Sequence, residues 1–262
     1  MRTEKVSDKV TAEGLKSWKG RPEKIAALTA YDYPTARLLD EAGVDLLLVG
    51  DSLGMVILGY PDTTFVTLED IVHHTRAVAR GIRRSLLVAD LPIGTYGDAG
   101  QALESARRLV EAGAEAVKLE GGQSQAEQIR AITGAGIPLV GHIGMLPQHV
   151  HEEGGYRIKG RTEAEREFLV REAEAVVAAG ACAVVLELVA PRVAEQITRA
   201  IAIPTIGIGS GPHCDGQILV VHDLVGFFPW FTPKHVRPAA DVAGEIREAA
   251  ARFAENLHRA GA

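Results

Sequence analysis

The sequence predicts an α/β fold of the (β/α)8-barrel (TIM-barrel) class, and three observations support this prediction. Short apolar runs alternate with amphipathic segments from residue 25 to residue 226. The runs are apolar on consecutive residues, which is typical of parallel strands covered on both faces rather than of a half-exposed antiparallel sheet. A segment of the type EAGVDLLLVGD occurs three times, from Glu41, Glu111 and Ala178, and leads each time from a helix end through Gly into a strand. Eight parallel strands inside a ring of helices would produce this pattern.

Eight apolar runs are the predicted strands of the barrel. They are IAALTA from Ile25, LLLVG from Leu46, SLLVAD from Ser85, AVKLE from Ala116, PLVGHI from Pro138, CAVVLEL from Cys182, PTIGIG from Pro204 and ILVVHD from Ile218. The segments between them carry the signals of helix ends. Pro34 and Pro191 suit the first turn of a helix, and Thr67 and Thr162 can cap a helix N-terminus.

No segment is rich enough in Ser, Pro or Gly to separate two domains, so we expect a single barrel domain over residues 1–262. A short helical stretch at residues 12–18 would form an N-terminal extension that closes the end of the barrel opposite the strand C-termini. The last segment, residues 241–258, places apolar side chains on one stripe at helical spacing. This C-terminal helix is either the eighth barrel helix or a contact between subunits.

Composition and cysteine usage exclude several classes of protein. The formal net charge is −6, so no excess of basic residues indicates nucleic acid binding. Cys182 and Cys214 are far apart and form no Cys-x-x-Cys pair, which argues against a disulfide framework or a structural zinc site. No apolar stretch approaches the roughly 20 residues that cross a bilayer. These features favour a cytoplasmic protein that acts on small molecules.

Four acidic residues stand at the ends of predicted strands. Asp51, Glu120 and Glu187 close the strands of the three repeats, and Asp90 ends a fourth strand in the same manner. The carboxyl ends of the strands of a (β/α)8 barrel meet on the face that carries active sites. We therefore expect the four carboxylates to point into one pocket.

Three of these acids, Asp51, Asp90 and Glu120, are candidate metal ligands. A buried carboxylate is costly unless it is paired, hydrogen-bonded or bound to a cation. Oxygen ligands without His or Cys favour Mg²⁺ over zinc. Each acid could instead merely cap the helix that follows its strand. The glycines in GDSLG and KLEGG favour the metal site, because they allow the backbone to approach a ligand closely.

Lys118 precedes Glu120 by two residues, so both side chains should point to the same face of their strand. A buried lysine can neutralise a substrate carboxylate or, if its pKa is depressed, form a Schiff base. It can also be only a counter-ion for the neighbouring acids.

Glu187 lies in the otherwise apolar run VVLELVAP, where burial would strengthen its carboxylate as a base. We interpret Glu187 as the candidate general base; a carboxylate satisfied by a neighbouring strand is the alternative. His142, in GHIG on the fifth predicted strand, ranks below it, because a single barrel histidine is more often a hydrogen-bonded support.

Two predicted connections, residues 54–67 and 144–162, exceed the usual two to six or so residues of such loops. Loops of this length often cover a site. The Gly-rich segment 207–216 after the seventh predicted strand could bind phosphate on its backbone amides or simply reverse the chain over a pocket.

Nine segments, in this order, resemble the ketopantoate hydroxymethyltransferase family. They are TAYDYPTARL from Thr29, VGDSLGMV from Val49, LVADLP from Leu87, VKLEGG from Val117, GHIGMLPQ from Gly141, GGYRIKGR from Gly154, VLEL from Val185, IPTIGIGSG from Ile203 and DGQILVVHD from Asp215. The resemblance covers roughly residues 25–234. At positions where the family varies, this sequence has Ser210 in the glycine loop and an apolar run at residues 229–231.

The resemblance implies a barrel of the phosphoenolpyruvate/pyruvate-like superfamily and a Mg²⁺-dependent transferase of pantothenate biosynthesis, assembled as a homodecamer with one Mg²⁺ in each subunit. The implied reaction converts 3-methyl-2-oxobutanoate and 5,10-methylenetetrahydrofolate to 2-dehydropantoate. The resemblance further implies that Asp51, Asp90 and Glu120 serve the metal. It implies that the oxo acid meets Asp51, Ser52, Asp90 and Lys118.

By the same resemblance, Glu187 is the base that removes the substrate proton. The anionic tail of the folate could meet Arg157, Lys159 and Arg161 on the second long loop, although a solvated loop is the alternative. A metal-dependent 2-oxo acid aldolase or carbon-carbon lyase on the same barrel would need the same enolate stabilisation and is the main alternative function. A Schiff-base aldolase and a catalytically silent scaffold are further alternatives, but a scaffold has no reason to keep acids at four buried strand ends.

Overall fold

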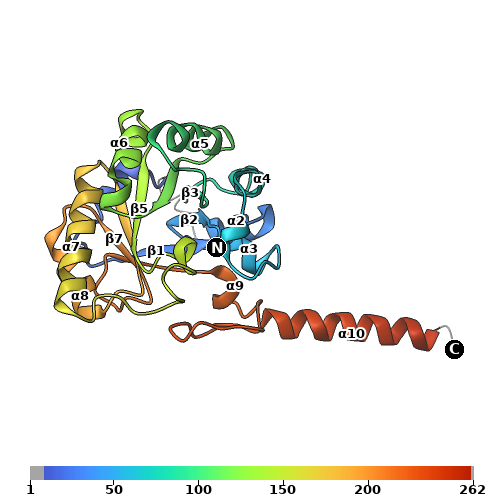
Figure 1. Cartoon of the computed structure of the whole chain (residues 1–262). Coiled ribbons are helices and arrows are strands. Elements are labelled where there is room, and N and C mark those ends of the chain that lie inside the picture. The colour runs from blue at the N-terminus through green and yellow to red at the C-terminus, as the bar shows by residue number, and fades with distance from the viewer. Residues whose placement is uncertain (1–8, 261–262) are drawn as a thin grey trace. The chain divides into compact units, whose positions relative to one another are not determined.

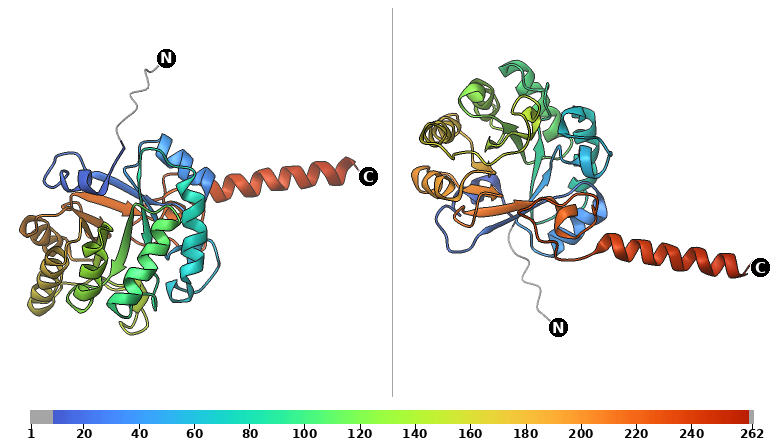
Figure 2. Two further views of the ribbon diagram at one scale, coloured as in Figure 1. Left: turned by 90° about the horizontal axis from the view of Figure 1, so that it is seen from above. Right: turned by 60° about the horizontal axis from the view of Figure 1, so that its bottom comes forward.

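The structure is a computed structural model that describes residues 9–260. Within these residues, eight parallel strands close a barrel in chain order, and the helices that connect successive strands lie outside them (Figures 1 and 2). The strands are β1 (Ile25–Thr29), β2 (Leu46–Val49), β3 (Leu86–Asp90), β4 (Ala116–Glu120), β5 (Leu139–Gly144), β6 (Ala183–Glu187), β7 (Thr205–Ile208) and β8 (Gly216–Leu219). The predicted (β/α)8 barrel is confirmed.

The eighth strand begins two residues earlier than predicted. Gly216 pairs with Ile206 of β7, and a Cβ at Gly216 would lie only 2.6 Å from the Cβ of Ile25 on β1. The chain must therefore pass β1 at a glycine, which fixes the start of the strand. The prediction that VVHD continues the strand is wrong, because Val220 is already the N-cap of the short helix α9 (Val221–Leu224).

The helices follow the punctuation that the sequence shows. They are α1 (Ala12–Lys16), α2 (Tyr33–Glu41), α3 (Leu53–Val56), α4 (Leu68–Ala79), α5 (Ala99–Glu111), α6 (Ala126–Gly134), α7 (Glu163–Ala178) and α8 (Pro191–Ala200), with 3-10 turns η1 (Thr63–Phe65), η2 (Gln123–Gln125) and η3 (Pro147–His149). Thr67 and Thr162 form capping boxes at the starts of α4 and α7. Pro34 and Pro191 lie in first turns, as predicted.

Apolar side chains fill the barrel and continue into the N-terminal extension. Leu15 of α1 is fully buried and belongs to the same apolar cluster as Ile25, Leu46 and Ile206. The backbone N–H of Val10 donates to the carbonyl of Arg84, just before β3 begins. Helix α1 therefore covers the N-terminal end of the strands, as predicted, and burial of Leu15 alone contributes roughly 2 kcal/mol.

Acidic side chains also mark this N-terminal end of the barrel. Asp45, Glu115 and Asp215 each come directly before a strand, and each accepts a backbone N–H from the preceding strand or its start. Arg84 pairs with Asp45 at 2.6 Å, and Lys19 pairs with Asp215 at 2.9 Å. These carboxylates tie neighbouring strands together and are satisfied by groups of the protein itself.

The chain divides into two compact units, residues 1–218 and residues 219–262. In the second unit, α9 leads to α10 (Val242–Ala260), which begins within one residue and ends within two residues of the predicted helix. His222 stacks on Phe227 with the ring centroids 5.1 Å apart. The single domain and the subunit contact both stay predictions. None of the described helices is long and apolar enough to cross a membrane.

Candidate active site

The three predicted metal ligands lie at the C-terminal ends of three adjacent strands. Asp51 follows β2, Asp90 ends β3 and Glu120 ends β4, and their exposed fractions are only 5%, 1% and 1%. The backbone N–H of Asp51 donates to the Asp90 carboxylate over 3.3 Å. The predicted convergence of these acids at one end of the barrel is confirmed.

Lys118 lies among these carboxylates on β4. Its Nζ is 2.9 Å from Asp90 Oδ1 and 3.8 Å from Glu120 Oε1, because Lys118 and Asp90 are register partners on adjacent strands. Lys118 and Glu120 do face the same side of β4. Burial lowers the pKa of Lys118, but the charges of Asp90, Glu120 and Asp51 outweigh burial and raise the pKa above its ordinary value. The amine is therefore held as an ammonium ion.

His142 of β5 connects this group to the predicted base. Its Nδ1 lies 3.1 Å from Lys118 Nζ and 3.2 Å from Glu120 Oε1, and its Nε2 lies 3.3 Å from Glu187 Oε2. Burial and the Lys118 ammonium lower the pKa of His142, but Glu120 and Glu187 raise it to about 9. The imidazole thus carries positive charge at neutral pH and links the two carboxylates.

Glu187 ends β6 at the same end of the barrel, and its side chain is 14% exposed. The sequence placed this carboxylate in an apolar run, whereas the structure gives it His142 as a charged neighbour. Its position at the border between the buried cluster and solvent leaves one side of the carboxylate open. A proton acceptor in this place can face a bound substrate.

The backbone beside Glu187 is held in an uncommon conformation. Leu188 is the non-glycine residue with a positive φ, +47°, in the part of the chain that the structure describes. The buried Ser210 hydroxyl spans this turn: it donates to the Leu186 carbonyl over 2.7 Å and accepts the Val189 N–H over 2.9 Å. The glycine loop after β7 therefore fixes the end of β6, which is a structural role that the sequence did not reveal.

Gln148 is a site residue that the sequence reasoning missed. It lies on η3 in the first part of the loop after β5, and only 1% of it is exposed. Its Nε2 donates to Asp51 Oδ2 over 2.8 Å, and its backbone N–H donates to Glu120 Oε2 over 3.1 Å. The segment GHIGMLPQ was a family signal, but no periodicity shows where a loop side chain points.

Ser52 lies at the rim of the cluster. Its Oγ is 2.8 Å from the hydroxyl of the buried Tyr31, and the Tyr31 carbonyl lies 2.6 Å from His74 Nδ1. Ser52 directly follows Asp51 in the sequence, so it lies next to one of the candidate metal ligands. Tyr31 belongs to the quoted segment TAYDYPTARL, but its contact with Ser52 was not predicted.

Negative charge exceeds positive charge in this pocket. Four carboxylates, those of Asp51, Asp90, Glu120 and Glu187, surround the cations of Lys118 and His142. Burial and then the charges of the neighbouring acids raise the pKa of Asp51 well above its ordinary value, and burial and Glu120 raise the pKa of Asp90 despite Lys118. The pocket is thus electrostatically suited to a further cation.

The arrangement fits Mg²⁺ held by few protein ligands. Within residues 9–260, no three side chains of His, Cys, Asp or Glu are grouped as a complete metal cage. Mg²⁺ does not need one, because it commonly binds one or two carboxylates and fills its other positions with water and substrate oxygens. Asp51 and Asp90 have the raised pKa values that an added cation would relieve. Glu120 is already engaged by His142 and Gln148, and these contacts lower its pKa despite burial.

The two long loops meet beside the site. His151 Nε2 on the second loop lies 2.8 Å from Asp62 Oδ2 on the first, and η1 contacts η3. Burial and then the charges of Glu187, Asp51 and other acids raise the pKa of Tyr156 on the second loop. The expectation that these loops lie over the site is consistent with these contacts.

The three cationic residues of the second long loop, Arg157, Lys159 and Arg161, differ in their surroundings. Lys159 pairs with Glu153, and its backbone pairs with residues 188–190 after β6. Arg157 and Arg161 are exposed. Lys159 thus has a structural role in holding the loop to the end of β6, and its contact with a folate tail stays a prediction.

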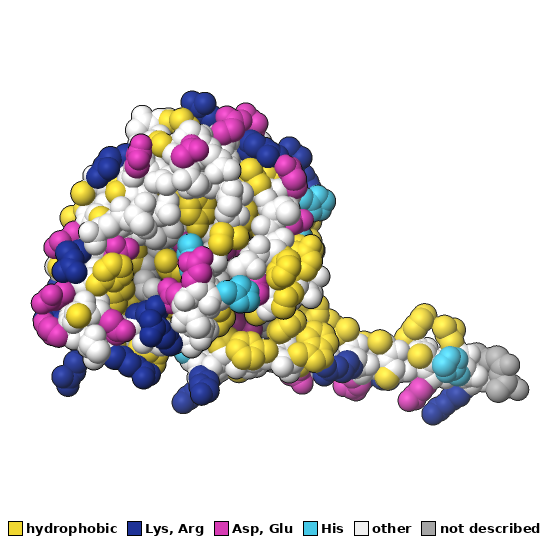
Figure 3. All heavy atoms as spheres, viewed as in Figure 1, with side chains coloured by type: hydrophobic (Ala, Val, Ile, Leu, Met, Phe, Trp, Pro, Cys, Tyr) yellow, Lys and Arg dark blue, Asp and Glu magenta, His cyan; other side chains and the backbone are white. Residues whose placement is uncertain are grey.

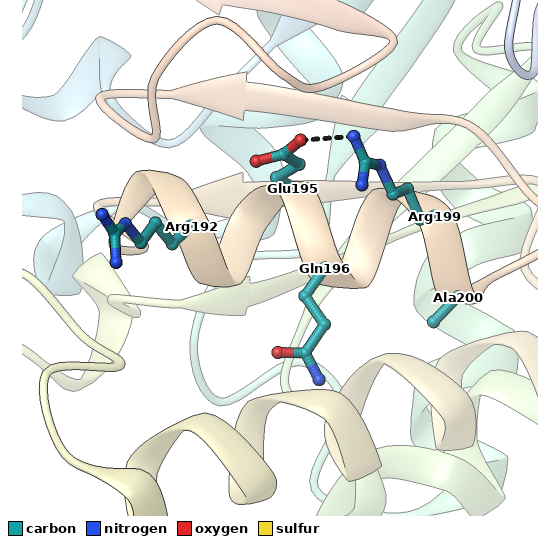
Figure 4. Close-up of a pocket in the computed structure, with 5 residues that line it drawn as sticks. All are labelled: Arg192, Glu195, Gln196, Arg199 and Ala200. Carbon is teal, nitrogen blue, oxygen red and sulfur yellow. Dashed lines mark hydrogen bonds and ion pairs between the residues drawn. The ribbon is translucent and has the colours of Figure 1, made fainter.

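A surface hollow of about 340 Å³ lies elsewhere, on the outer helix α8 (Figure 4). It is lined by Arg192, Glu195, Gln196, Arg199 and Ala200. Glu195 and Arg199 pair at 2.6 Å, and the hollow lies on an outer helix, apart from the strand ends that carry the acids. The face drawn in Figure 3 instead shows acidic side chains and histidine near the middle of the barrel, with most lysine and arginine side chains toward its rim.

A (β/α)8 barrel with buried acids, a lysine and a histidine at the C-terminal strand ends is typical of enzymes that act on small substrates at this end of the barrel. The family model for ketopantoate hydroxymethyltransferase matches residues 9–261. The chain belongs to this family.

Curated relatives agree with the family over most of the chain. A 3-methyl-2-oxobutanoate hydroxymethyltransferase of Acetivibrio thermocellus is 49% identical over 254 residues, which are 96% of this chain and 90% of the relative. One from Aeropyrum pernix is 52% identical over 252 residues, 95% of this chain and 91% of the relative.

Solved structures of other proteins share the fold of this chain. Phosphoenolpyruvate phosphomutase from Streptomyces platensis has a TM-score of 0.65 at 17% identity and covers 95% of this chain and 88% of its own. Phosphonopyruvate hydrolase in complex with oxalate and Mg²⁺ has a TM-score of 0.64 at 17% identity, with 94% and 87% covered. 2,3-Dimethylmalate lyase, a member of the PEP mutase/isocitrate lyase superfamily, has a TM-score of 0.60 at 18% identity, with 96% and 88% covered. These structures share the (β/α)8-barrel fold of this chain, and the predicted superfamily stays a prediction.

Proposed function

We propose that this chain is a Mg²⁺-dependent 3-methyl-2-oxobutanoate hydroxymethyltransferase of pantothenate biosynthesis. It would transfer a one-carbon unit from 5,10-methylenetetrahydrofolate to 3-methyl-2-oxobutanoate, and with one water the products would be 2-dehydropantoate and tetrahydrofolate. The observation that carries the proposal is the buried group of acids around Lys118, with Glu187 at its open side. The family membership and the names of the relatives support it.

Asp51 and Asp90 would hold the divalent cation. Glu120, which contacts His142 and the backbone N–H of Gln148, would serve the cation as a further carboxylate. When bound, the cation supplies positive charge that stabilises the enolate oxygen of the substrate. The excess of buried carboxylates supports this assignment, because without a cation these carboxylates oppose one another.

Lys118 and Ser52 would bind and orient the oxo acid. The ammonium of Lys118 is buried and kept charged by the acids around it, so it can attract the substrate carboxylate at little cost in ordering. The Ser52 hydroxyl, next to Tyr31, can donate to a substrate oxygen. Both residues lie beside Asp51 and Asp90, which fits a substrate that spans the cation and the lysine.

Glu187 would remove the proton from C3 of the oxo acid. The C3–H bond breaks, the proton moves to the Glu187 carboxylate, and the electron pair forms the enolate. C3 of the enolate then bonds to the methylene carbon of the folate. The two bonds from that carbon to folate nitrogens break, water supplies the hydroxyl group, and the nitrogens take up the proton from C3 and one proton of the water, which gives 2-dehydropantoate and tetrahydrofolate. The positive charge of His142, 3.3 Å from Glu187, orients the carboxylate toward the pocket. If the two long loops, which meet beside the site, cover the bound substrate, they would keep water from returning a proton to the enolate.

The main rival functions make different predictions. A Schiff-base aldolase needs a neutral lysine, whereas the carboxylates raise the pKa of Lys118. Borohydride in the presence of 3-methyl-2-oxobutanoate would trap an adduct on Lys118 in such an aldolase, and we expect none. The activity of a metal-dependent lyase or aldolase would not depend on the folate. Product formation that requires 5,10-methylenetetrahydrofolate therefore supports the transferase.

The first test is hydrogen-deuterium exchange at C3 of 3-methyl-2-oxobutanoate, followed by NMR with and without Mg²⁺. The exchange needs no folate, so it isolates enolisation. We expect Mg²⁺-dependent exchange in the wild type and a loss of about 100-fold to 10,000-fold in Glu187→Gln, the range for a positioned general base. A matched control is Glu195→Gln on α8, which leaves the site untouched and should exchange like the wild type. Equal exchange rates in Glu187→Gln and the wild type would sink the assignment of the base.

Assembly and location belong to the same proposal. Family resemblance supports a homodecamer and a cytoplasmic enzyme. Light scattering coupled to size-exclusion chromatography measures the mass of the assembly, to be compared with 27.9 kDa for one chain. A monomer that retains full transferase activity would contradict the decamer and leave the activity standing.

A further inference from the structure

The Gln148 side chain is the hub of a buried hydrogen-bond network that reaches two of the three predicted metal ligands. Its Nε2 donates to Asp51 Oδ2 over 2.8 Å and to the Leu91 carbonyl over 3.0 Å. Its backbone N–H donates to Glu120 Oε2 over 3.1 Å. Its Oε1 accepts a hydrogen bond from the Tyr96 hydroxyl. Both side-chain N–H groups and the carbonyl oxygen are thus used.

Two acceptors determine which way the Gln148 amide faces, and the Tyr96 hydroxyl holds the other side of the amide in that orientation. Tyr96 is 4% exposed, and burial together with the nearby acids raises its pKa, so its hydroxyl keeps the proton that it donates. If the amide turned over, its oxygen would face Asp51 Oδ2 and the Leu91 carbonyl, which are both acceptors, and its NH₂ would face the Tyr96 hydroxyl. These two acceptors therefore disfavour the reversed amide, and the Tyr96 hydroxyl, which donates to Oε1 in the observed orientation, completes the hydrogen bonding of the amide.

The amide in turn limits where the Asp51 carboxylate can lie. Asp51 Oδ2 receives the Gln148 N–H, which leaves Oδ1 for another partner. Glu120 is tied to the same residue through the Gln148 backbone, so one short segment, η3, sets the spacing of two carboxylates from different strands. Partners of this kind are known to fix metal ligands in general, and their loss typically costs 10-fold to 100-fold in metal affinity.

We propose that Gln148 and Tyr96 are positioning residues that hold Asp51 and Glu120 in the arrangement that receives the divalent cation, with Tyr96 acting through the Gln148 amide. This inference rests on the proposed function, because it assigns the cation to that site. Neither residue is assigned contact with the substrate. The two residues are 52 positions apart in the sequence, and no repeat or strand pattern joins them.

The test measures binding of Mn²⁺ in place of Mg²⁺ by electron paramagnetic resonance, where free Mn²⁺ gives a signal that the bound ion loses. The variants are Gln148→Met, which keeps the length of the side chain without the amide, Tyr96→Phe, which removes one hydroxyl, and the double variant. We expect the Mn²⁺ dissociation constant to rise about 10-fold to 100-fold in Gln148→Met and about 3-fold to 10-fold in Tyr96→Phe. Tyr96→Phe removes a single hydroxyl group, so wild-type Mn²⁺ affinity in this variant alone overturns the role of Tyr96.

The double variant separates positioning from general stability. Because Tyr96 acts through the amide, Tyr96→Phe should add little to the Mn²⁺ dissociation constant once Gln148→Met is present. Thr198→Val is the matched control: it removes a buried hydroxyl that bonds Thr205 at the other end of the barrel. It should lower the unfolding temperature and leave Mn²⁺ binding unchanged. In the C3 exchange assay, the KM for Mg²⁺ should rise more than the maximal rate falls.

The outcomes distinguish this inference from the proposed function. Wild-type Mn²⁺ affinity in both single variants, or additive effects in the double variant, overturns the positioning roles while the proposed function stands. A wild type that binds no Mn²⁺ and catalyses no C3 exchange overturns the proposed function and this inference with it. The proposal is supported if Mn²⁺ binding is weaker in both single variants, if the two effects do not add in the double variant, and if the control binds Mn²⁺ like the wild type.

Discussion

The two ends of the barrel use the same residue types for opposite purposes. At the N-terminal end, Asp215 accepts backbone N–H groups of Thr205 and Gly20 and pairs with Lys19, and these contacts lower its pKa despite burial. At the C-terminal end, burial and neighbouring acids raise the pKa of Asp51. The protein itself satisfies the Asp215 carboxylate at the first end, whereas the raised pKa of Asp51 at the second end fits the proposed cation site.

This difference shows that burial and position alone do not identify a functional acid. Both ends carry acids that are less than a tenth exposed. What distinguishes them is whether backbone N–H groups and cations of the chain itself fully compensate the charge. The balance between acids and compensating groups is therefore the quantity that mutations should probe.

The largest expected effect comes from neutralising an acid at the C-terminal end. Asp51→Asn should lower the rate of C3 exchange by at least about 100-fold, because it removes a candidate metal ligand. It should at the same time raise the stability of the metal-free protein by about 1 kcal/mol, because it removes a charge that its neighbours oppose. Urea unfolding in EDTA, run beside the exchange assay, measures both. A variant that is inactive and also less stable than the wild type would contradict the idea that this end is strained by excess charge.

The corresponding substitution at the N-terminal end of the barrel is Asp215→Asn. Asp215→Asn keeps the size of the side chain but loses charge-assisted hydrogen bonds, so we expect a loss of about 2 kcal/mol in unfolding free energy. The exchange rate per folded molecule should not change, because no contact joins Asp215 to the site. Urea unfolding measures the first and NMR exchange the second. A loss of activity larger than the loss of folded protein would show that the two ends are coupled.

Two of the sequence repeats each carry one acid for the N-terminal end of the barrel and one acid for the C-terminal end. The segment from Glu41 carries Asp45 before its strand and Asp51 after it, and the segment from Glu111 carries Glu115 and Glu120 in the same places. The direction of the chain predicts which acid faces the active-site end, and the structure confirms it. The reason that Asp45 and Glu115 are present was not predicted, because their partners are backbone groups of other strands.

Other parts of the site lay beyond sequence reasoning for a physical reason. Strands and their ends follow from apolar periodicity, but Gln148 and Tyr96 lie in loops, where the direction of a side chain depends on long-range packing. The eighth strand was misplaced because an apolar run continues through its end, and only the close approach of Gly216 to Ile25 shows where it starts. Residues in loops therefore need the structure even when their motif is familiar.

A pH series sharpens the comparison further. The folded-state pKa values of Asp40 and Asp215 lie below the unfolded value, because each carboxylate accepts backbone N–H groups. Their contribution to stability is thus present above the unfolded pKa and is lost as the pH falls through the folded pKa. Urea unfolding from about pH 7 down to about pH 3 should show the Asp215→Asn deficit shrinking toward zero at the acidic end. A deficit that stays constant with pH would mean that Asp215 stabilises the fold through shape rather than charge.

The smallest expected effect comes from removing the Ser210 hydroxyl, which is uncharged and holds the end of β6 in place. Ser210→Ala removes the hydroxyl that spans the Leu188 turn, leaving the Val189 N–H without its acceptor, so Glu187 should lose part of its fixed direction. We expect the C3 exchange rate to fall about 3-fold to 10-fold and the unfolding free energy to fall by about 1 kcal/mol. Ser210→Thr keeps the hydroxyl and should restore the rate if its methyl group fits. Because Ser210 touches no charged atom of the site, a change in maximal rate without a change in the KM for Mg²⁺ would show that the glycine loop acts on the base alone, while an equal shift of both would place its effect on the whole pocket.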